Sequence, residues 1–241
     1  MKRITIIGSG YVGISMATLL AQKNKVTAFD VDIERVNLIN DKKSTVKDDL
    51  IETYLEKYSE NIQATSDPDI AFKNPDLIII ATPTNYDEDK KHFDTSSIEV
   101  VIEQAVKRDY LGPILIKSTI PVGYTRKLNS MYKNNIMFSP EFLREGNALE
   151  DNLYPSRIII SSDCEDAKVI TSLLNDATVN KDTSVLFMSP EEAESVKLFA
   201  NSFLAMRVSY FNELDSYAMS NNLNTKNIID MHFLVQKEVA E

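Results

Sequence analysis

The chain has 241 residues, 43% of them apolar, which is enough for one or two folded domains with buried cores. Its 26 Lys and Arg against 36 Asp and Glu give a formal net charge of −10, which argues against nucleic acid or an anionic membrane surface as a partner. A single cysteine, Cys164, excludes an intrachain disulfide, and with only two histidines no structural metal is expected.

The first residues do not have the pattern of a targeting segment. Only residues 4–7 separate the basic start of the chain from Gly8, which is too short for the apolar core of a signal peptide. The densest apolar run, residues 77–81, is far too short to cross a bilayer. We therefore expect a soluble, cytoplasmic protein.

Short β-branched runs alternate with stretches of helical periodicity along most of the chain, which is typical of a parallel sheet covered on both faces. Strands are predicted at residues 3–7, 25–29, 77–81, 114–117, 136–138, 157–161 and 184–188. Helices are predicted at residues 13–22, 33–40, 96–107, 126–132 and 165–177. The expected fold class is α/β, with a doubly wound parallel sheet of Rossmann type.

A long helix is predicted after this sheet. Pro190 and the two glutamates that follow it form a helix start, and apolar residues recur at helical spacing as far as Met219. We expect domain boundaries at 1–189 for the sheet, 190–221 for the helix and 222–241 for the start of a further domain. A helix of this length either carries that domain or pairs with a copy of itself, and we expect a homodimer.

A glycine-rich hexapeptide follows the first predicted strand. Its sequence, GSGYVG at residues 8–13, opens a predicted helix, and Asp30 ends the second predicted strand. Here Gly8 permits a tight turn, Gly10 lets a pyrophosphate approach the backbone, and Gly13 allows the helix to pack closely on the strand. Asp30 would accept hydrogen bonds from the adenosine ribose and repel a 2′-phosphate, so we expect NAD rather than NADP.

Arg35 leaves three alternatives open. It lies one and a half helical turns past Asp30 and would favour a 2′-phosphate if it reached one. Stacking on an adenine ring or simple solvation explains an arginine at this position as well.

Polar residues follow two further predicted strands. Thr82 and Thr84 come after residues 77–81, and Thr119 comes after residues 114–117. In an open α/β sheet the ligand crevice lies at the carboxyl ends of the strands, so these side chains are expected to face cofactor and substrate. Turn and helix-capping roles are the alternative, since Ser and Thr serve them widely.

The strand at residues 136–138 is followed by a charged segment, 141–146, in which Glu141 and Glu145 flank an arginine. Two carboxylates near a reacting centre divide the roles of general base and water positioning, although a solvated loop is the alternative. Lys197 and Asn201 lie four residues apart on the long helix and so project from one face. An ammonium and an amide there would stabilise an oxyanion, although a solvated helix face is again the alternative.

Taken together, these motifs resemble the UDP-glucose/GDP-mannose dehydrogenase family, from Met1 to about Asp230. Six motifs occur in the order that the family shows: the glycine loop, residues 82–84, residues 117–119, residues 141–146, Lys197 with Asn201, and residues 212–213. Segments 141–146 and 151–157 are most similar to the members that oxidise UDP-glucose. The resemblance implies NAD-dependent oxidation of UDP-glucose to UDP-glucuronate through an aldehyde and a cysteine-bound thioester.

The resemblance also implies roles for single residues. It implies that Val12, Asp30, Arg35, Thr84, Thr119 and Glu145 contact NAD, and with the residues of the glycine motif and the strand-end loop the full predicted NAD-binding set is Gly8, Gly10, Tyr11, Val12, Gly13, Asp30, Arg35, Thr82, Thr84, Thr119 and Glu145. Those implied to act in catalysis are Thr119, Glu141, Glu145, Lys197 and Asn201, with Glu141 as the general base and the last two at the oxygen of C6. Those implied to bind the nucleotide sugar are Glu141, Phe142, Leu143, Arg144, Glu145, Lys197 and Asn201.

The chain departs from the family at the nucleophilic cysteine. The family carries it in a glycine-rich loop beyond the segment similar to residues 224–230, whereas residues 231–241 contain neither glycine nor cysteine. Cys164 is not expected to replace it, because neighbouring acids would raise the pKa of its thiol. We expect this chain to be a truncated portion that binds NAD without producing UDP-glucuronate.

Other functions remain open from the sequence alone. A GDP-mannose or UDP-N-acetylmannosamine dehydrogenase would share most of the motifs. A β-hydroxyacid dehydrogenase would keep the glycine loop and long helix without needing residues 141–145. A non-catalytic NAD-binding or dimerisation module is the third alternative.

Overall fold

The computed structural model describes residues 1–89 and 91–231. The chain divides into two compact units, residues 1–197 and 198–241. Half of the predicted further domain at 222–241, residues 232–241, lies outside the described residues. Within the described part, none of the helices is long and apolar enough to cross a membrane.

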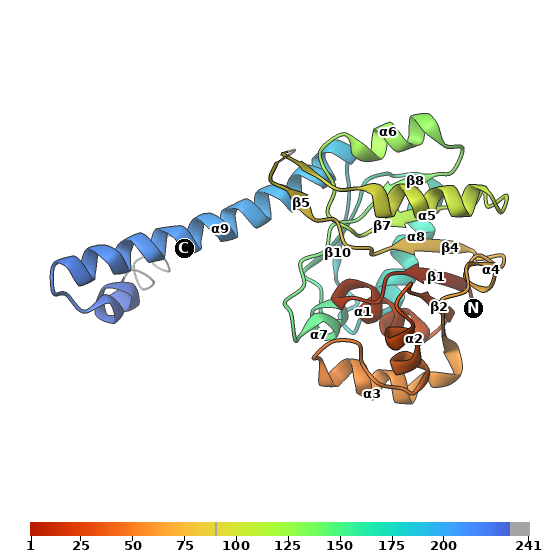
Figure 1. The fold of residues 1–241 in the computed structure, drawn as a ribbon, viewed down its shortest axis with the longest axis horizontal. Coiled ribbons are helices and arrows are strands. Elements are labelled where there is room, and N and C mark those ends of the chain that lie inside the picture. The colour runs from red at the N-terminus through yellow and green to blue at the C-terminus, as the bar shows by residue number, and fades with distance from the viewer. Residues whose placement is uncertain (90, 232–241) are drawn as a thin grey trace. The chain divides into compact units, whose positions relative to one another are not determined.

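The first unit is built on a six-stranded parallel sheet with the order β3-β2-β1-β4-β7-β8 (Figure 1). Its strands are β1 (Arg3–Ile7), β2 (Lys25–Phe29), β3 (Ile62–Thr65), β4 (Leu77–Ile80), β7 (Ile114–Ile116) and β8 (Ile136–Phe138). The order reverses between β1 and β4, which places a ligand crevice at the carboxyl ends of these strands. The predicted doubly wound Rossmann fold is confirmed.

Helices cover both faces of this sheet. The helices are α1 (Tyr11–Ala21), α2 (Ile33–Asn40), α3 (Asp49–Lys57), α4 (Pro68–Ala71), α5 (Ser96–Val106), α6 (Tyr124–Met131), α7 (Ala148–Leu153) and α8 (Glu165–Ala177), with a 3₁₀ turn at Ser59–Asn61. Successive side chains of a strand point to opposite faces, so Leu77 and Ile79 pack in one core while Ile78 and Ile80 pack in the other. The first core joins α1, α2, α3, α7 and α8, and the second joins α4, α5 and α6.

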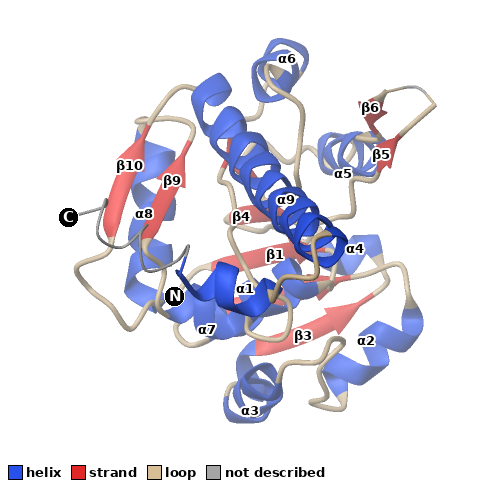
Figure 2. Cartoon of the chain, turned by 90° about the vertical axis from the view of Figure 1, so that its left-hand side faces the viewer, coloured by secondary structure: helices blue, strands red, loops and turns tan. Residues whose placement is uncertain are grey.

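The last two predicted strands do not extend the central sheet, which corrects our expectation of one continuous sheet. β9 (Arg157–Ile160) and β10 (Ser184–Phe187) form a separate two-stranded parallel sheet (Figure 2). Ser161, just past β9, hydrogen-bonds to β8: its N–H donates to the Phe138 carbonyl at 2.9 Å, and its hydroxyl accepts from the Phe138 N–H at 2.7 Å. A β-branched run shows that a strand forms without showing which strand it joins.

A short hairpin, β5 (Tyr86–Asp87) with β6 (His92–Phe93), interrupts the path from β4 to α5. The long helix α9 (Pro190–Ser220) begins and ends close to the predicted residues. Ser189 and Glu192 form a capping box at its start, with the Ser189 N–H 2.7 Å from the Glu192 carboxylate. The predicted boundaries at residues 189 and 221 stay predictions.

Candidate functional site

Two of the three glycines in the turn between β1 and α1 cannot be replaced without movement of the backbone. Gly8 has φ +94°, and a Cβ there would lie 2.6 Å from the Ala81 carbonyl oxygen. A Cβ at Gly13 would lie 1.8 Å from the Gly8 carbonyl oxygen, so α1 begins in direct contact with the turn. At Gly10, by contrast, a Cβ would meet no atom within 4 Å, which leaves the backbone open to a ligand.

Asp30 closes this turn from the tip of β2. It is buried, and its Oδ2 accepts from the Ser9 N–H at 2.8 Å and the Ser9 hydroxyl at 2.5 Å. Nη1 of Arg35 lies 3.8 Å from the same oxygen, and Nε of Arg35 lies 3.6 Å from the Asp32 carboxylate. The charge of Arg35 is therefore balanced by two carboxylates, a fourth possibility besides the three left open above.

A cavity of about 940 Å³ opens above the tips of the strands. Among the predicted site residues, it is lined by Gly8, Gly10, Tyr11, Val12, Asp30, Arg35, Thr82, Thr84, Thr119 and Glu141. This volume is in the range of sites for ligands and cofactors. Residues separated by more than a hundred positions thus share one cavity, as expected for a crevice at the carboxyl ends of parallel strands.

Hydrogen bonds tie the loops of this cavity together. The Ser118 hydroxyl donates to the Thr82 carbonyl oxygen at 2.6 Å, which joins the loop after β7 to the loop after β4. The Ser97 hydroxyl, in the first turn of α5, bonds to the Thr82 hydroxyl at 2.9 Å and to the Pro83 carbonyl at 3.0 Å. These bonds hold the loop after β7 and the start of α5 against the loop after β4.

Glu141 and Lys197 form a mostly buried ion pair at the edge of this cavity. Nζ of Lys197 lies 2.6 Å from Oε1 of Glu141 and 2.7 Å from its backbone oxygen, and the two side chains are 8% and 14% exposed. The second carboxylate oxygen accepts from the Leu143 N–H at 2.9 Å. The alternative of Lys197 as a solvated surface residue is therefore wrong.

The remaining predicted residues lie elsewhere. Gly13 packs beneath the glycine turn, and Glu145 is exposed and is not among the residues that line the cavity. Arg144 pairs with Asp151 at 2.6 Å. Asn201 is an exposed residue of the second unit. The roles of these four residues stay predictions.

Phe142 and Leu143 line a second cavity of about 240 Å³, which shares Lys117 and Glu141 with the first. The Phe142 ring lies beneath two cations: the Arg157 guanidinium is 4.8 Å from its centroid and the Lys197 ammonium 5.7 Å. Such cation–π contacts hold the ring between Arg157 and Lys197, the second of which also pairs with Glu141.

Lys117 is a site residue to which the sequence analysis gave no role. Its ammonium is buried between the two cavities, 3.3 Å from the Ser139 hydroxyl and 3.4 Å from the Pro140 carbonyl oxygen. Burial lowers the pKa of Lys117 to about 8; Glu141 opposes this shift and Lys197 adds to it. The sequence did indicate that this lysine is buried, because Lys117 ends a predicted strand and a parallel sheet covered on both faces leaves such a side chain little access to water.

This pKa predicts a pH dependence of stability. Between about pH 8 and the ordinary pKa of 10.5, the unfolded chain holds the Lys117 proton while the folded chain has lost it. The unfolding free energy should therefore rise with pH across this window, by up to about 3 kcal/mol from this residue. Urea titrations of the wild type and of Lys117→Met at several pH values measure this contribution. The variant has no ionisable group at position 117, so its unfolding free energy should not show this rise with pH. An identical pH profile in both proteins contradicts the prediction.

Cys164 requires a correction. It is the N-cap residue of α8, and neighbouring acids were expected to raise the pKa of its thiol. Burial does raise that pKa, but hydrogen bonds from Ser162, from Asn135 at 3.1 Å and from the backbone N–H groups of residues 166 and 167 outweigh burial and lower it. Hydrogen bonds to the sulfur, from two side chains and from N–H groups at the start of a helix, favour the thiolate.

Taken together, the sheet order, the glycine turn at the tip of β1 and the acid at the tip of β2 define a dinucleotide-binding domain of Rossmann type. The chain belongs to the UDP-glucose/GDP-mannose dehydrogenase family. Residues 2–177 match the NAD binding domain of that family, and residues 191–237 match its central domain. The expectation of an NAD-binding domain is confirmed.

Individual relatives agree with this assignment. The chain is 45% identical over 236 residues to the UDP-glucose 6-dehydrogenase of Streptococcus pneumoniae, covering 95% of this chain and 60% of that protein. It is 45% identical over 230 residues to the corresponding Campylobacter jejuni enzyme, covering 94% of this chain and 58% of that protein. The chain thus spans about three-fifths of the length of these relatives.

Solved structures show the same fold. A UDP-glucose dehydrogenase from Pyrobaculum islandicum superposes with a TM-score of 0.87 at 26% identity, covering 98% of this chain and 57% of that one. A ternary complex of GDP-mannose dehydrogenase from Pseudomonas aeruginosa superposes with a TM-score of 0.84 at 24% identity, covering 95% of this chain and 56% of that one.

Proposed function

We propose that the 940 Å³ cavity binds NAD in one orientation, with the adenosine ribose at Asp30, the pyrophosphate over Gly10 and the nicotinamide toward Thr119 and Glu141. The observation that carries this proposal is that all four residues line the same cavity. The open backbone at Gly10 favours close approach of a phosphate, and the start of α1 supplies the positive end of a helix dipole.

We propose further that the protein of which this chain is a part oxidises UDP-glucose to UDP-glucuronate. The two relatives at 45% identity carry the name UDP-glucose 6-dehydrogenase, which supports this substrate over GDP-mannose or UDP-N-acetylmannosamine. NAD, when bound, accepts the hydride. The chain supplies Thr119 and Glu141 to hold water, and Lys197 and Asn201 to stabilise negative charge at the oxidised carbon's oxygen.

The geometry of Glu141 suits a residue that must stay fixed. One carboxylate oxygen is held by the Lys197 ammonium and the other by the Leu143 N–H, so its orientation is set by the protein. A carboxylate held at the cavity wall is placed to accept a proton from a water molecule there. We expect the 241-residue chain alone to bind NAD without producing UDP-glucuronate, since its one cysteine, Cys164, is not among the residues lining the cavity.

We also propose a homodimer through residues 198–219. Exposed apolar side chains are frequent on this part of α9: Phe199, Phe203, Leu204, Met206, Val208, Tyr217 and Met219. An apolar surface of this kind is normally covered by a partner. Sedimentation equilibrium should give twice the chain mass, and a monomer at micromolar concentration contradicts the proposal. The cytoplasmic location stays a prediction.

Calorimetric titration of the chain with NAD, NADP and UDP-glucose tests the cofactor assignment. NADP should bind at least about tenfold more weakly than NAD, because its 2′-phosphate would meet the Asp30 carboxylate. Asp30→Asn should reduce the difference in affinity between NAD and NADP, since the amide removes the repelling charge while keeping the size and shape of the side chain. Equal affinity of the wild type for both dinucleotides contradicts the assignment, and so does the absence of NAD binding.

A further inference from the structure

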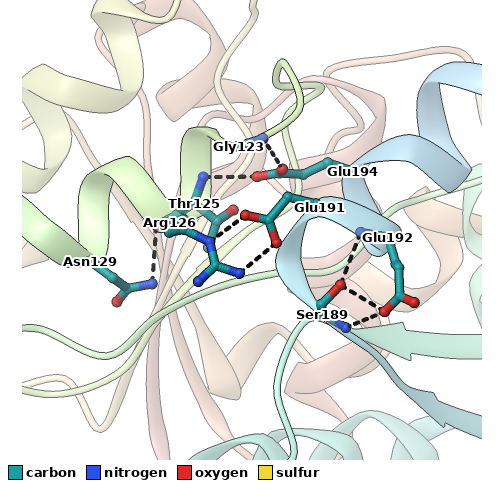
Figure 3. Close-up of polar contacts among 8 residues, drawn as sticks. All are labelled: Gly123, Thr125, Arg126, Asn129, Ser189, Glu191, Glu192 and Glu194. Carbon is teal, nitrogen blue, oxygen red and sulfur yellow. Dashed lines mark hydrogen bonds and ion pairs between the residues drawn. The ribbon is translucent and has the colours of Figure 1, made fainter.

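Helix α6 begins without a cap of its own. Its N-cap residue is Gly123, with φ +88°, which has no side chain to accept a hydrogen bond. The first N–H groups of any helix lack partners within the helix. Here Glu194, in the second turn of α9, accepts from the Gly123 N–H at 2.5 Å and from the Thr125 N–H at 2.8 Å (Figure 3).

Glu194 is suited to this contact by charge and burial. It is 0% exposed, and a buried carboxylate is costly unless its oxygens are hydrogen-bonded. Both of its oxygens are bonded, and its negative charge lies at the positive end of α6. The neighbouring pair between Arg126 and Glu191 joins the same two helices at the surface (Figure 3).

The N-terminus of α6, which Glu194 caps, is also where a loop that lines the cavity ends. Residues 117–123 connect β7 to α6, and Thr119 faces the cavity from this loop. One end of the loop is held by the bond from Ser118 to the Thr82 carbonyl. The other end is held by Glu194. One turn further along α9, Lys197 holds Glu141, so the same helix restrains the loops after both β7 and β8.

We propose that Glu194 is a positioning residue, which holds Thr119 in place at the cavity by capping α6. The proposal rests on the proposed function in one respect, namely that the nicotinamide end of NAD lies toward Thr119. A substitution at Glu194 should therefore weaken the binding of the nicotinamide end of the cofactor and leave the binding of its adenosine end unchanged.

Glu194→Gln tests the proposal, with binding measured by calorimetry for NAD and for ADP-ribose, which lacks the nicotinamide. The amide has one oxygen and accepts one of the two bonds, while its NH₂ group faces the other N–H. We expect the dissociation constant for NAD to rise about five- to tenfold and that for ADP-ribose to change by less than about twofold.

Glu192→Gln is the matched control, because Glu192 lies in the same helix but bonds to Ser189 at its own N-terminus and not to α6. Neither affinity should change in it. An equal loss of both affinities in Glu194→Gln, or no loss of either, overturns the proposal. If the wild type binds neither ligand, the NAD site itself fails; if it binds both and Glu194→Gln behaves like Glu192→Gln, only the role of Glu194 fails.

Hydrogen exchange of the wild-type protein tests the same proposal without relying on the folding of a variant. Hydrogen exchange of the Gly123 and Thr125 amides should slow on addition of NAD, and slow less on addition of ADP-ribose. Equal protection of these two amides by NAD and by ADP-ribose would show that the cap of α6 is not coupled to the nicotinamide end. That result would overturn the proposal.

Discussion

Replacing Gly13 with alanine is expected to lower the midpoint of thermal unfolding by about 10 °C, equivalent to about 3 kcal/mol for a chain of this size. The new Cβ would lie 1.8 Å from the Gly8 carbonyl oxygen, a contact that only backbone movement relieves. Alanine favours a helix over glycine by about 1 kcal/mol, which is too little to offset the clash. Because the turn must shift, NAD affinity should fall at least about a hundredfold, or by about 3 kcal/mol.

Gly10→Ala is the matched control for this variant. Its backbone has φ −71° and ψ −172°, which alanine adopts, and its Cβ would meet no protein atom within 4 Å. The unfolding midpoint should therefore stay close to that of the wild type while NAD affinity falls, since the methyl group occupies space assigned to the pyrophosphate. Unchanged stability in Gly13→Ala, or unchanged NAD affinity in Gly10→Ala, contradicts this interpretation of the turn.

Lys197→Met is expected to lower the unfolding free energy by about 3 kcal/mol, because it leaves the carboxylate of Glu141 without its cation in a mostly buried place. The pair is joined at 2.6 Å with side chains 8% and 14% exposed, so water does not replace the lost partner well. Urea denaturation at pH 7 measures the change. Far smaller losses, below about 1 kcal/mol, are typical of exposed pairs.

Glu141→Gln combined with Lys197→Met completes a double-mutant cycle. The double variant should be more stable than Lys197→Met alone, because a neutral amide removes the unpaired charge. Arg126→Met, which breaks the surface pair with Glu191, serves as the exposed comparison and should change stability by less than about 1 kcal/mol. A loss of the same size in Arg126→Met and Lys197→Met contradicts a buried ion pair at Glu141.

The parts of the fold that follow from local periodicity were predictable. The strands at residues 3–7, 25–29 and 136–138 match the structure, because short runs of apolar and β-branched residues form its buried strands. β3 was missed because it is a four-residue edge strand containing Gln63 and lacks that signal. α3 was missed although Asp48 caps it, with a carboxylate oxygen 3.2 Å from the Leu50 N–H.

The residues of the candidate site were predictable where the spacing within one motif is enough to assign them to the site. The glycine turn and Asp30 depend on spacing within a single βαβ unit, so sequence alone placed them together. The partners of Glu141 could not be placed in this way. Whether Lys197 points to solvent or to Glu141 depends on how α9 packs against the loop after β8, and no local pattern encodes that packing. The burial of Glu194 is likewise a property of the assembled fold.

The most direct test of the account is a crystal structure of the chain grown with NAD. We predict one dinucleotide in the 940 Å³ cavity, with its adenosine ribose hydroxyls within hydrogen-bond distance of Asp30, its pyrophosphate against Gly10 and its nicotinamide beside Thr119. A dinucleotide bound at another surface, or bound in this cavity with its two ends exchanged, would contradict the account.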